Sequence, residues 1–207
     1  MSLKINGIEV IGFKFDGIEA LEAKLNGNIV WQKAPTYIDT EFTACPFPTE
    51  WTEVTTNLKY TATNDYGAWT ISASNFYGGN YGCSNAFDGS NSTQWNAGEL
   101  ADNNTYETLE ISCPILIKPS TIIFRCSSQG NSTNLSKIQG YNIETSTWED
   151  LSTVTRTGSS ATTRTLTVST DNFYSKFRAL CYRYSSSSDI PRVQEFQITA
   201  GTIRQES

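Results

Sequence analysis

Residues 84–95 read SNAFDGSNSTQW. Asp88-Gly89 predicts a tight turn, because glycine adopts the positive φ angles that such turns require. The stretch lies inside a long polar segment, residues 75–107, that is rich in Gly, Ser and Asn. Long polar loops on a β scaffold are where binding residues usually lie. We therefore expect a functional loop here.

Working outward, apolar residues alternate with polar ones on both sides of this segment, a pattern that predicts β-strands. The alternating positions are Trp69, Ile71 and Ala73; Leu109, Ile111 and Cys113; Ile122, Phe124 and Cys126; Tyr141 and Ile143; Leu166 and Val168; Phe177, Ala179 and Cys181; and Phe196 and Ile198. Further long polar loops cover residues 127–136, 155–163 and 183–191. Short strands between such loops predict an antiparallel sandwich or barrel.

The overall charge limits the class of partner. The net charge is −6, which disfavours nucleic acid and anionic membranes. We find no signal peptide, and the longest apolar runs, such as residues 115–117, are far too short to span a bilayer. We therefore expect assembly in the cytoplasm.

The catalytic residue types are sparse. The sequence has no His, the commonest general base, and no nucleophile-elbow, P-loop or zinc-protease motif. The five cysteines contain no CxxC pair, so we expect reduced, mostly buried thiols and not a zinc site. The sequence predicts a protein that is not an enzyme.

A ten-residue repeat opens the chain: KING at residues 4–7, KFDG at 14–17 and KLNG at 24–27. Asn-Gly and Asp-Gly are strong hairpin signals, so residues 8–15, 18–25 and 28–31 are predicted strands of a small β-meander over residues 1–33. Residues 18–25 could also be helical by composition. So small a sheet needs cover, either as a hairpin packed on the main domain or as an element for docking or oligomerisation.

Proline residues separate this meander from the rest. Pro35, Pro46 and Pro48 disfavour regular structure, so residues 34–59 are predicted to be a connector. We expect the main domain to cover residues 60–202, followed by a tail, residues 203–207.

Three motifs in order carry a family resemblance. Ala86-Phe87-Asp88-Gly89 followed by Thr93-x-Trp95 resembles the opening motif of the discoidin family, which includes coagulation factor 5/8 type C domains and galactose-binding carbohydrate modules. Residues 122–151, with Trp148 and Leu151, and residues 174–198, with Glu195, resemble later strands of that family. The resemblance covers residues 65–200 and implies an all-β, eight-stranded jelly-roll sandwich.

The resemblance also implies a calcium site in the loop after Asp-Gly. The matching ligands are the carboxylates of Asp88 and Glu195, the Ser90 carbonyl and the Thr93 oxygens. Such hard oxygen ligands suit Ca²⁺. Ser90 departs from the family, where many relatives have a further Asp or Asn. The alternative is an Asp-Gly turn without an ion.

The sugar site of the family implies a second set of residues. Arg125 and Asn131 match an Arg that ends one strand and a polar residue in the next loop, while Tyr77, Tyr81 and Tyr184 are candidates to cover the apolar face of a sugar. The frequent His partner is missing, which is a departure from galactose-binding relatives. Arg125 could instead form a surface ion pair, and Tyr77 and Tyr81 could be core residues. Trp95 is predicted to be a core residue at the end of the sandwich.

The opening repeat resembles the N-terminal segments of phage and prophage tail or virion proteins. Together the two resemblances imply a non-catalytic carbohydrate-binding or adhesion protein of a virion. Its expected partners are glycans of a bacterial cell surface, other virion proteins and further copies of itself. The alternatives are a structural virion protein without sugar binding and a module of a secreted glycan-degrading system.

Overall fold

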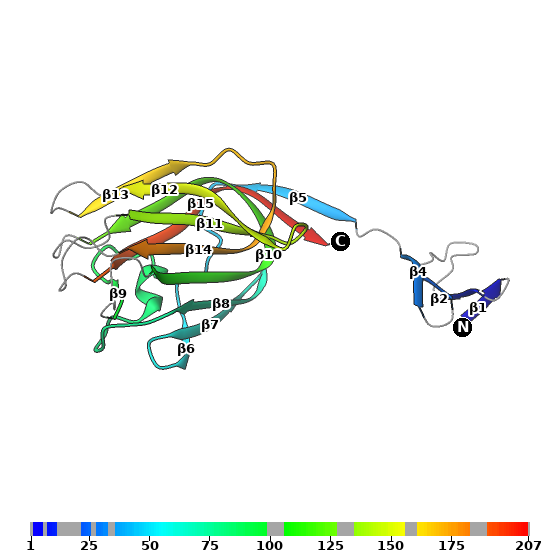
Figure 1. The fold of residues 1–207 in the computed structure, drawn as a ribbon, viewed down its shortest axis with the longest axis horizontal. Helices are drawn as coiled ribbons and strands as arrows, with labels where there is room; N and C mark the ends of the chain where they lie inside the picture. The colour runs from blue at the N-terminus through cyan, green and yellow to red at the C-terminus, as the bar shows by residue number, and fades with distance from the viewer. Residues whose placement is uncertain are drawn as a thin grey trace. The chain divides into compact units, whose positions relative to one another are not determined.

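The computed structural model describes residues 2–5, 8–11, 22–25, 28–32, 36–98, 106–127, 135–155, 161–182 and 190–206. The chain divides into two compact units, one formed mainly by Met1–Ile38 and the other by Asp39–Gln205 (Figure 1). In the described residues, no helix is long and apolar enough to cross a membrane.

The first unit is an antiparallel meander. Its strands lie in the order β1 (Ser2–Ile5), β2 (Ile8–Ile11), β3 (Glu22–Leu25) and β4 (Asn28–Gln32). Ile5 pairs with Ile8, and Leu25 pairs with Asn28, so two residues separate each pair as an Asn-Gly hairpin requires. The predicted meander is confirmed, with β1 as an additional strand, and Glu22–Leu25 is a strand and not a helix. The Asp16-Gly17 turn lies outside the described residues.

Within its described residues, the second unit is an antiparallel β-structure of eleven strands. Its elements are β5 (Tyr37–Phe42), β6 (Thr52–Thr55), β7 (Lys59–Asn64), β8 (Gly67–Ala73), the 3₁₀ turn η1 (Cys83–Ala86), β9 (Trp95–Asn96), β10 (Tyr106–Cys126), β11 (Leu135–Asn142), β12 (Thr147–Thr155), β13 (Thr162–Thr167), β14 (Tyr174–Tyr182) and β15 (Arg192–Glu206). The main order is β12-β11-β14-β10-β8-β7-β6, and β15 pairs with β10, β5 and β9. The predicted jelly roll has eight strands, and the short strands β6 and β9 are among the additional ones.

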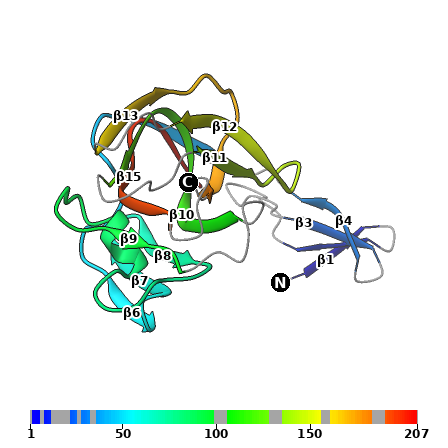
Figure 2. The ribbon, with the colours of Figure 1, turned by 60° about the vertical axis from the view of Figure 1, so that its left-hand side comes forward.

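One long strand, β10, belongs to both layers of the sandwich (Figures 1 and 2). Its first part pairs with β14 and β8, and its second part pairs with β13 and β15. Pro114 lies in the register shift between Ser112 and Ile117, and Pro119, opposite Gly201, borders the next shift, between Pro119 and Thr121. Prolines are tolerated at such irregular positions because they donate no ladder hydrogen bond. The alternation predicted two separate strands here, and the structure joins them into one.

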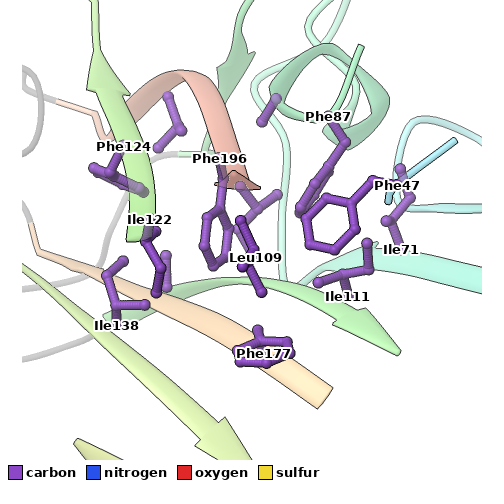
Figure 3. Packing of buried hydrophobic residues seen from close by; sticks show 14 of the residues in the cluster. Phe47, Ile71, Phe87, Leu109, Ile111, Ile122, Phe124, Ile138, Phe177 and Phe196 are labelled. Carbon is purple, nitrogen blue, oxygen red and sulfur yellow. The ribbon is translucent and has the colours of Figure 1, made fainter. Parts of the chain in front are cut away.

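The core lies between these layers (Figure 3). The fully buried Leu109 and Phe177 face Phe124 and Phe196. Phe87, from the 84–95 stretch, is 2% exposed, and its ring centroid lies 5.7 Å from that of Phe196. Burying one such side chain contributes about 1.5–3 kcal/mol. Residues 84–95 are therefore anchored in the hydrophobic core through Phe87.

Two boundaries differ from the sequence prediction. Residues 34–59, predicted to be a connector, contain β5 and β6, and β5 pairs with β15. This is possible because Pro46 and Pro48 fall between the two strands and so remove no ladder donor. Residues 203–206, predicted to be a tail, continue β15, and the Ile203 side chain is buried.

Candidate functional site

The Asp88 side chain shapes the loop of residues 88–93, which we call the 88–93 loop. Asp88 Oδ1 accepts a hydrogen bond from the Ser90 backbone N–H at 2.8 Å, and Gly89 has a φ of +74°. Asp88 Oδ2 accepts from the Thr93 hydroxyl at 2.7 Å. An Asp side chain commonly stabilises a turn in this way. The loop therefore has a defined local geometry set by its own sequence.

Trp95, directly after this loop, is a core residue as predicted. Its side chain is 0% exposed, and its indole Nε1–H donates to the Asn75 carbonyl at 3.0 Å. β9 pairs with β15 at this point, with Trp95 opposite Val193, and lies close to η1 (Figure 2). Trp95 therefore fixes the end of the loop and is not available as a sugar platform.

Glu195 on β15 lies against the 88–93 loop. The side chain is 4% exposed, and its carboxylate accepts a hydrogen bond from the Gly89 backbone N–H. Glu195 Oε1 is buried and has no hydrogen-bond partner among the described residues. Burial, and to a smaller extent the nearby Asp88 carboxylate, raises the pKa of the Glu195 carboxyl to about 7. A buried carboxylate oxygen without a partner is costly unless a cation or a proton compensates it.

The structure thus brings the four predicted calcium ligands together. Thr93 contacts both Asp88 and, at 3.4 Å, the Ser90 carbonyl, while Glu195 approaches from β15. The described residues contain no cluster of three or more His, Cys, Asp or Glu side chains. A cation here would rely on two carboxylates with carbonyl and hydroxyl oxygens, a donor set that fits Ca²⁺.

A pocket of about 390 Å³ borders the same loop. We name it the amide pocket; the described residues that line it are Asn80, Tyr81, Asn85, Asn91, Ser92, Thr93, Gln94, Ser127 and Gln194. None of these lining residues carries a charged side chain. Their amide and hydroxyl groups can both donate and accept hydrogen bonds. The pocket is therefore suited to a neutral ligand with many hydroxyl groups.

Hydrogen bonds fix the walls of the amide pocket. Asn85 Nδ2 donates to the carbonyls of Asn80 at 2.6 Å and Gln94 at 3.0 Å. Gln194 Nε2 donates to the Asn91 carbonyl at 2.8 Å. The Gln194 bond joins β15 to the 88–93 loop across 103 positions, whereas the Asn85 bonds span five and nine positions. Each bond restricts a wall residue and so lowers the entropic cost of binding.

Arg125 supports this pocket from outside. Its Nε–H donates to Gln194 Oε1 at 3.0 Å, and its Nη1 donates to the Thr163 hydroxyl. Arg125 is half-buried and is not among the lining residues. The structure therefore places this predicted sugar ligand one residue behind the pocket, where it orients Gln194.

The tyrosines predicted to contact sugar differ in their positions relative to the amide pocket. Tyr81 lines the amide pocket and is 38% exposed, whereas Tyr77 is 57% exposed and is not among the lining residues. Asn131 and Tyr184 lie outside the described residues. The amides of Asn80, Asn85, Gln94 and Gln194 were not predicted from the sequence. The density of Asn and Gln around residues 84–95 was a signal for the first three, and Gln194 joins them only through the fold.

Comparison with known proteins identifies the fold. No protein-family model matches the chain, and no curated protein matches it. The C-terminal domain of a chitobiase from Bacteroides fragilis matches with a TM-score of 0.53 at 14% identity, over 69% of this chain and 98% of that chain. The second unit has a discoidin-like fold. This confirms the predicted all-β jelly roll.

Two further solved structures resemble the discoidin-like domain. The family 32 carbohydrate-binding module of Clostridium perfringens NanJ, solved with galactose, has a TM-score of 0.48 at 15% identity over 72% of this chain and 100% of that chain. An F5/8 type C domain from Bacteroides fragilis has a TM-score of 0.47 at 16% identity over 71% and 97% of the two chains. At such low identity the likeness concerns the fold alone.

Proposed function

We propose that the discoidin-like domain is a non-catalytic carbohydrate-binding module and that the amide pocket is its binding site. The observation that carries this proposal is the lining of the pocket: neutral amides and hydroxyls beside one exposed tyrosine ring. Sugar hydroxyls donate and accept hydrogen bonds, as amides do. The Tyr81 ring offers an apolar surface with a polar edge, which suits the apolar face of a sugar.

A pair of tyrosine variants tests the location of the site. Tyr81→Ala removes the aromatic group that lines the pocket, and Tyr77→Ala removes an even more exposed tyrosine outside it. On a glycan array followed by titration calorimetry, we expect Tyr81→Ala to weaken binding about tenfold or more and Tyr77→Ala to leave it unchanged. The proposal is wrong if the intact protein binds no glycan, and the location is wrong if only Tyr77→Ala weakens binding.

We propose further that the 88–93 loop holds Ca²⁺ through Asp88, Ser90, Thr93 and Glu195. The buried Glu195 Oε1 without a described partner supports this assignment. Bound Ca²⁺ would supply the positive charge that two adjacent carboxylates require. Calorimetric titration with Ca²⁺ tests the assignment: Glu195→Gln, which keeps the shape and removes the charge, should abolish binding. Retained Ca²⁺ affinity in that variant would exclude Glu195 as a ligand.

For the first unit we propose a role in oligomerisation. The strand register places Leu3 opposite Val10, Val10 opposite Ala23 and Ala23 opposite Trp31, and the next same-face row contains Ile5, Ile8 and Leu25. Because strand residues alternate between faces, these apolar positions share one face of the sheet. The other face contains the row Lys4, Glu9, Lys24 and Ile29, in which three of the four positions carry charged residues.

A single four-stranded sheet cannot bury one of its own faces, so the apolar face needs cover from outside the sheet. We propose that further copies of this chain provide it. Val10→Lys should lower the oligomer size in light scattering, whereas Glu9→Gln, on the opposite face of β2, should not. An unchanged size for Val10→Lys would argue against the assignment.

The resemblance of this N-terminal repeat to phage tail proteins supports a place in a virion or tail. We propose that the protein is assembled into such a particle and presents many copies of the discoidin-like domain to bacterial surface glycans. Many weak sites on one particle gain avidity through effective concentration. Immunogold labelling of particles from a producing strain tests this location, and labelling confined to soluble protein would contradict it.

A further inference from the structure

The 88–93 loop borders two sites at once. Its first residue, Asp88, belongs to the cation site proposed above, and Asn91 and Ser92 line the amide pocket. Thr93 belongs to both, because its hydroxyl donates to Asp88 Oδ2 at 2.7 Å while the residue also lines the pocket. A single hydroxyl-bearing residue thus connects the carboxylate of one site to the wall of the other.

β15 makes the same connection from the opposite side of the loop. Gln194 and Glu195 are consecutive residues of β15 at a shift of its register with β10, because Glu195 pairs with Arg125 and Val193 pairs with Cys126. Gln194 lines the pocket and donates to the Asn91 carbonyl at 2.8 Å. Glu195 is 4% exposed and accepts the Gly89 N–H, with Oε1 left without a described partner. The 88–93 loop and β15 therefore each contribute residues to the proposed cation site and to the amide pocket.

We propose that the two sites are coupled: a divalent cation at Asp88 and Glu195 increases the affinity of the amide pocket for neutral sugar, and sugar increases the affinity for the cation. This coupling rests on the proposed carbohydrate-binding function. Without a cation, hydrogen bonds of Asp88 hold the 88–93 loop internally, and those of Asn91 and Gly89 hold it to β15. The loop also faces Glu195 Oε1, which has no hydrogen-bond partner among the described residues. A cation that binds both carboxylates adds a tie between the loop and β15.

The coupling is expected to be positive because the cation links the 88–93 loop to β15. The loop supplies Asn91, Ser92 and Thr93 to the pocket wall, and β15 supplies Gln194. Holding loop and strand together fixes the wall before sugar enters, so less ordering cost remains for the sugar. Linkage then requires that sugar raise the cation affinity by the same factor. Typical coupling between two sites amounts to about 5- to 150-fold.

Reciprocal titration calorimetry of the full chain tests the coupling. Galactose, fucose and N-acetylgalactosamine are each titrated with excess Ca²⁺ and with EDTA, and Ca²⁺ is titrated with and without the sugar that binds best. We expect the sugar affinity to rise about tenfold with Ca²⁺ and the Ca²⁺ affinity to rise by the same factor with sugar. Glu195→Gln should bind sugar with the affinity that the intact protein shows in EDTA, and Ca²⁺ should no longer change it. Asp171→Asn, which removes an exposed carboxylate outside the loop, should behave as the intact protein.

The outcomes separate the two proposals. Sugar binding of equal affinity with Ca²⁺ and with EDTA overturns the coupling and leaves the carbohydrate-binding function in place. Absence of Ca²⁺ binding overturns the coupling and the Ca²⁺ assignment, and it also leaves the carbohydrate-binding function in place. Absence of sugar binding in both conditions overturns the proposed function and the coupling with it. A Glu195→Gln protein that still responds to Ca²⁺ shows that the responding cation lies elsewhere, which overturns the assigned link.

Discussion

Arg204 holds Asp39 through two hydrogen bonds of 2.7 Å, from Nε to Oδ1 and from Nη2 to Oδ2. The pair joins β5 to β15 near the start of the discoidin-like domain. Paired N–H donors of an Arg fit a carboxylate well and give such contacts geometric specificity. The Arg204 guanidinium also lies 3.8 Å from the centroid of the Phe173 ring. This arrangement makes residues 39–42 part of the jelly roll instead of a linker.

Asp39→Asn should therefore weaken the contact between β5 and β15 and lower the free energy of unfolding slightly. It should also change how the free energy of unfolding depends on pH. The Arg204 hydrogen bonds lower the pKa of the Asp39 carboxyl in the folded state. A lowered folded-state pKa contributes stability above the unfolded pKa, and this contribution is lost as the pH falls through the folded pKa. Denaturation of the intact protein and the variant should differ at neutral pH and converge in acid. A constant difference at every pH would contradict this role.

Glu195 should make the free energy of unfolding depend on pH in the opposite direction from Asp39. Its pKa rises from 4.5 to about 7 on folding, first through burial and then through the Asp88 charge. The folded state thus holds this proton more tightly than the unfolded chain, so the free energy of unfolding falls as the pH rises across this window. The loss in EDTA should total about 3 kcal/mol, and Ca²⁺ should oppose it. Urea denaturation of the intact protein and Glu195→Gln measures the difference, and parallel pH profiles would contradict it.

Gly140→Ala should destabilise the discoidin-like domain because the added methyl group would clash with a buried side chain. A Cβ added at Gly140 on β11 would lie 2.6 Å from ring atoms of Tyr174, which is 1% exposed. The Tyr174 hydroxyl donates to Glu149 Oε2 at 2.8 Å, so the ring cannot move without breaking that bond. Overpacking of this kind costs about 1–3 kcal/mol. Thermal denaturation measures it, with Thr165→Ala at an exposed position of β13 as the control.

Arg125→Ala should weaken sugar binding without removing a pocket residue. The substitution frees Gln194 Oε1, so Gln194 holds the Asn91 carbonyl less firmly. We expect a loss of about threefold to tenfold in sugar affinity, less than for Tyr81→Ala, with unchanged Ca²⁺ affinity. Calorimetry of the double variant Arg125→Ala/Gln194→Ala completes a cycle. Additive effects of the two substitutions would show that Arg125 does not act through Gln194.

Features that depend on near neighbours in the chain were accessible from the sequence. The alternation of Phe177, Ala179 and Cys181 predicts the buried face of β14, and all three side chains are buried. Asn-Gly dipeptides predict the hairpins of the first unit because turn geometry depends on two residues. Asp88 and Thr93 are five positions apart, so their contact lies within one loop.

Tertiary structure brings together the residues that line the amide pocket. Gln194 meets Asn91 across 103 positions, next to the pairing of β9 with β15, and Arg125 meets Thr163 across 38 positions because β13 pairs with β10 there. Periodicity indicates which side of a strand faces the core, but it does not specify which strands become neighbours. For that reason the sequence by itself determined the strands, the turns and the loop chemistry, and only the packing of the sheets decided which amides enclose one pocket and why Arg125 lies behind it.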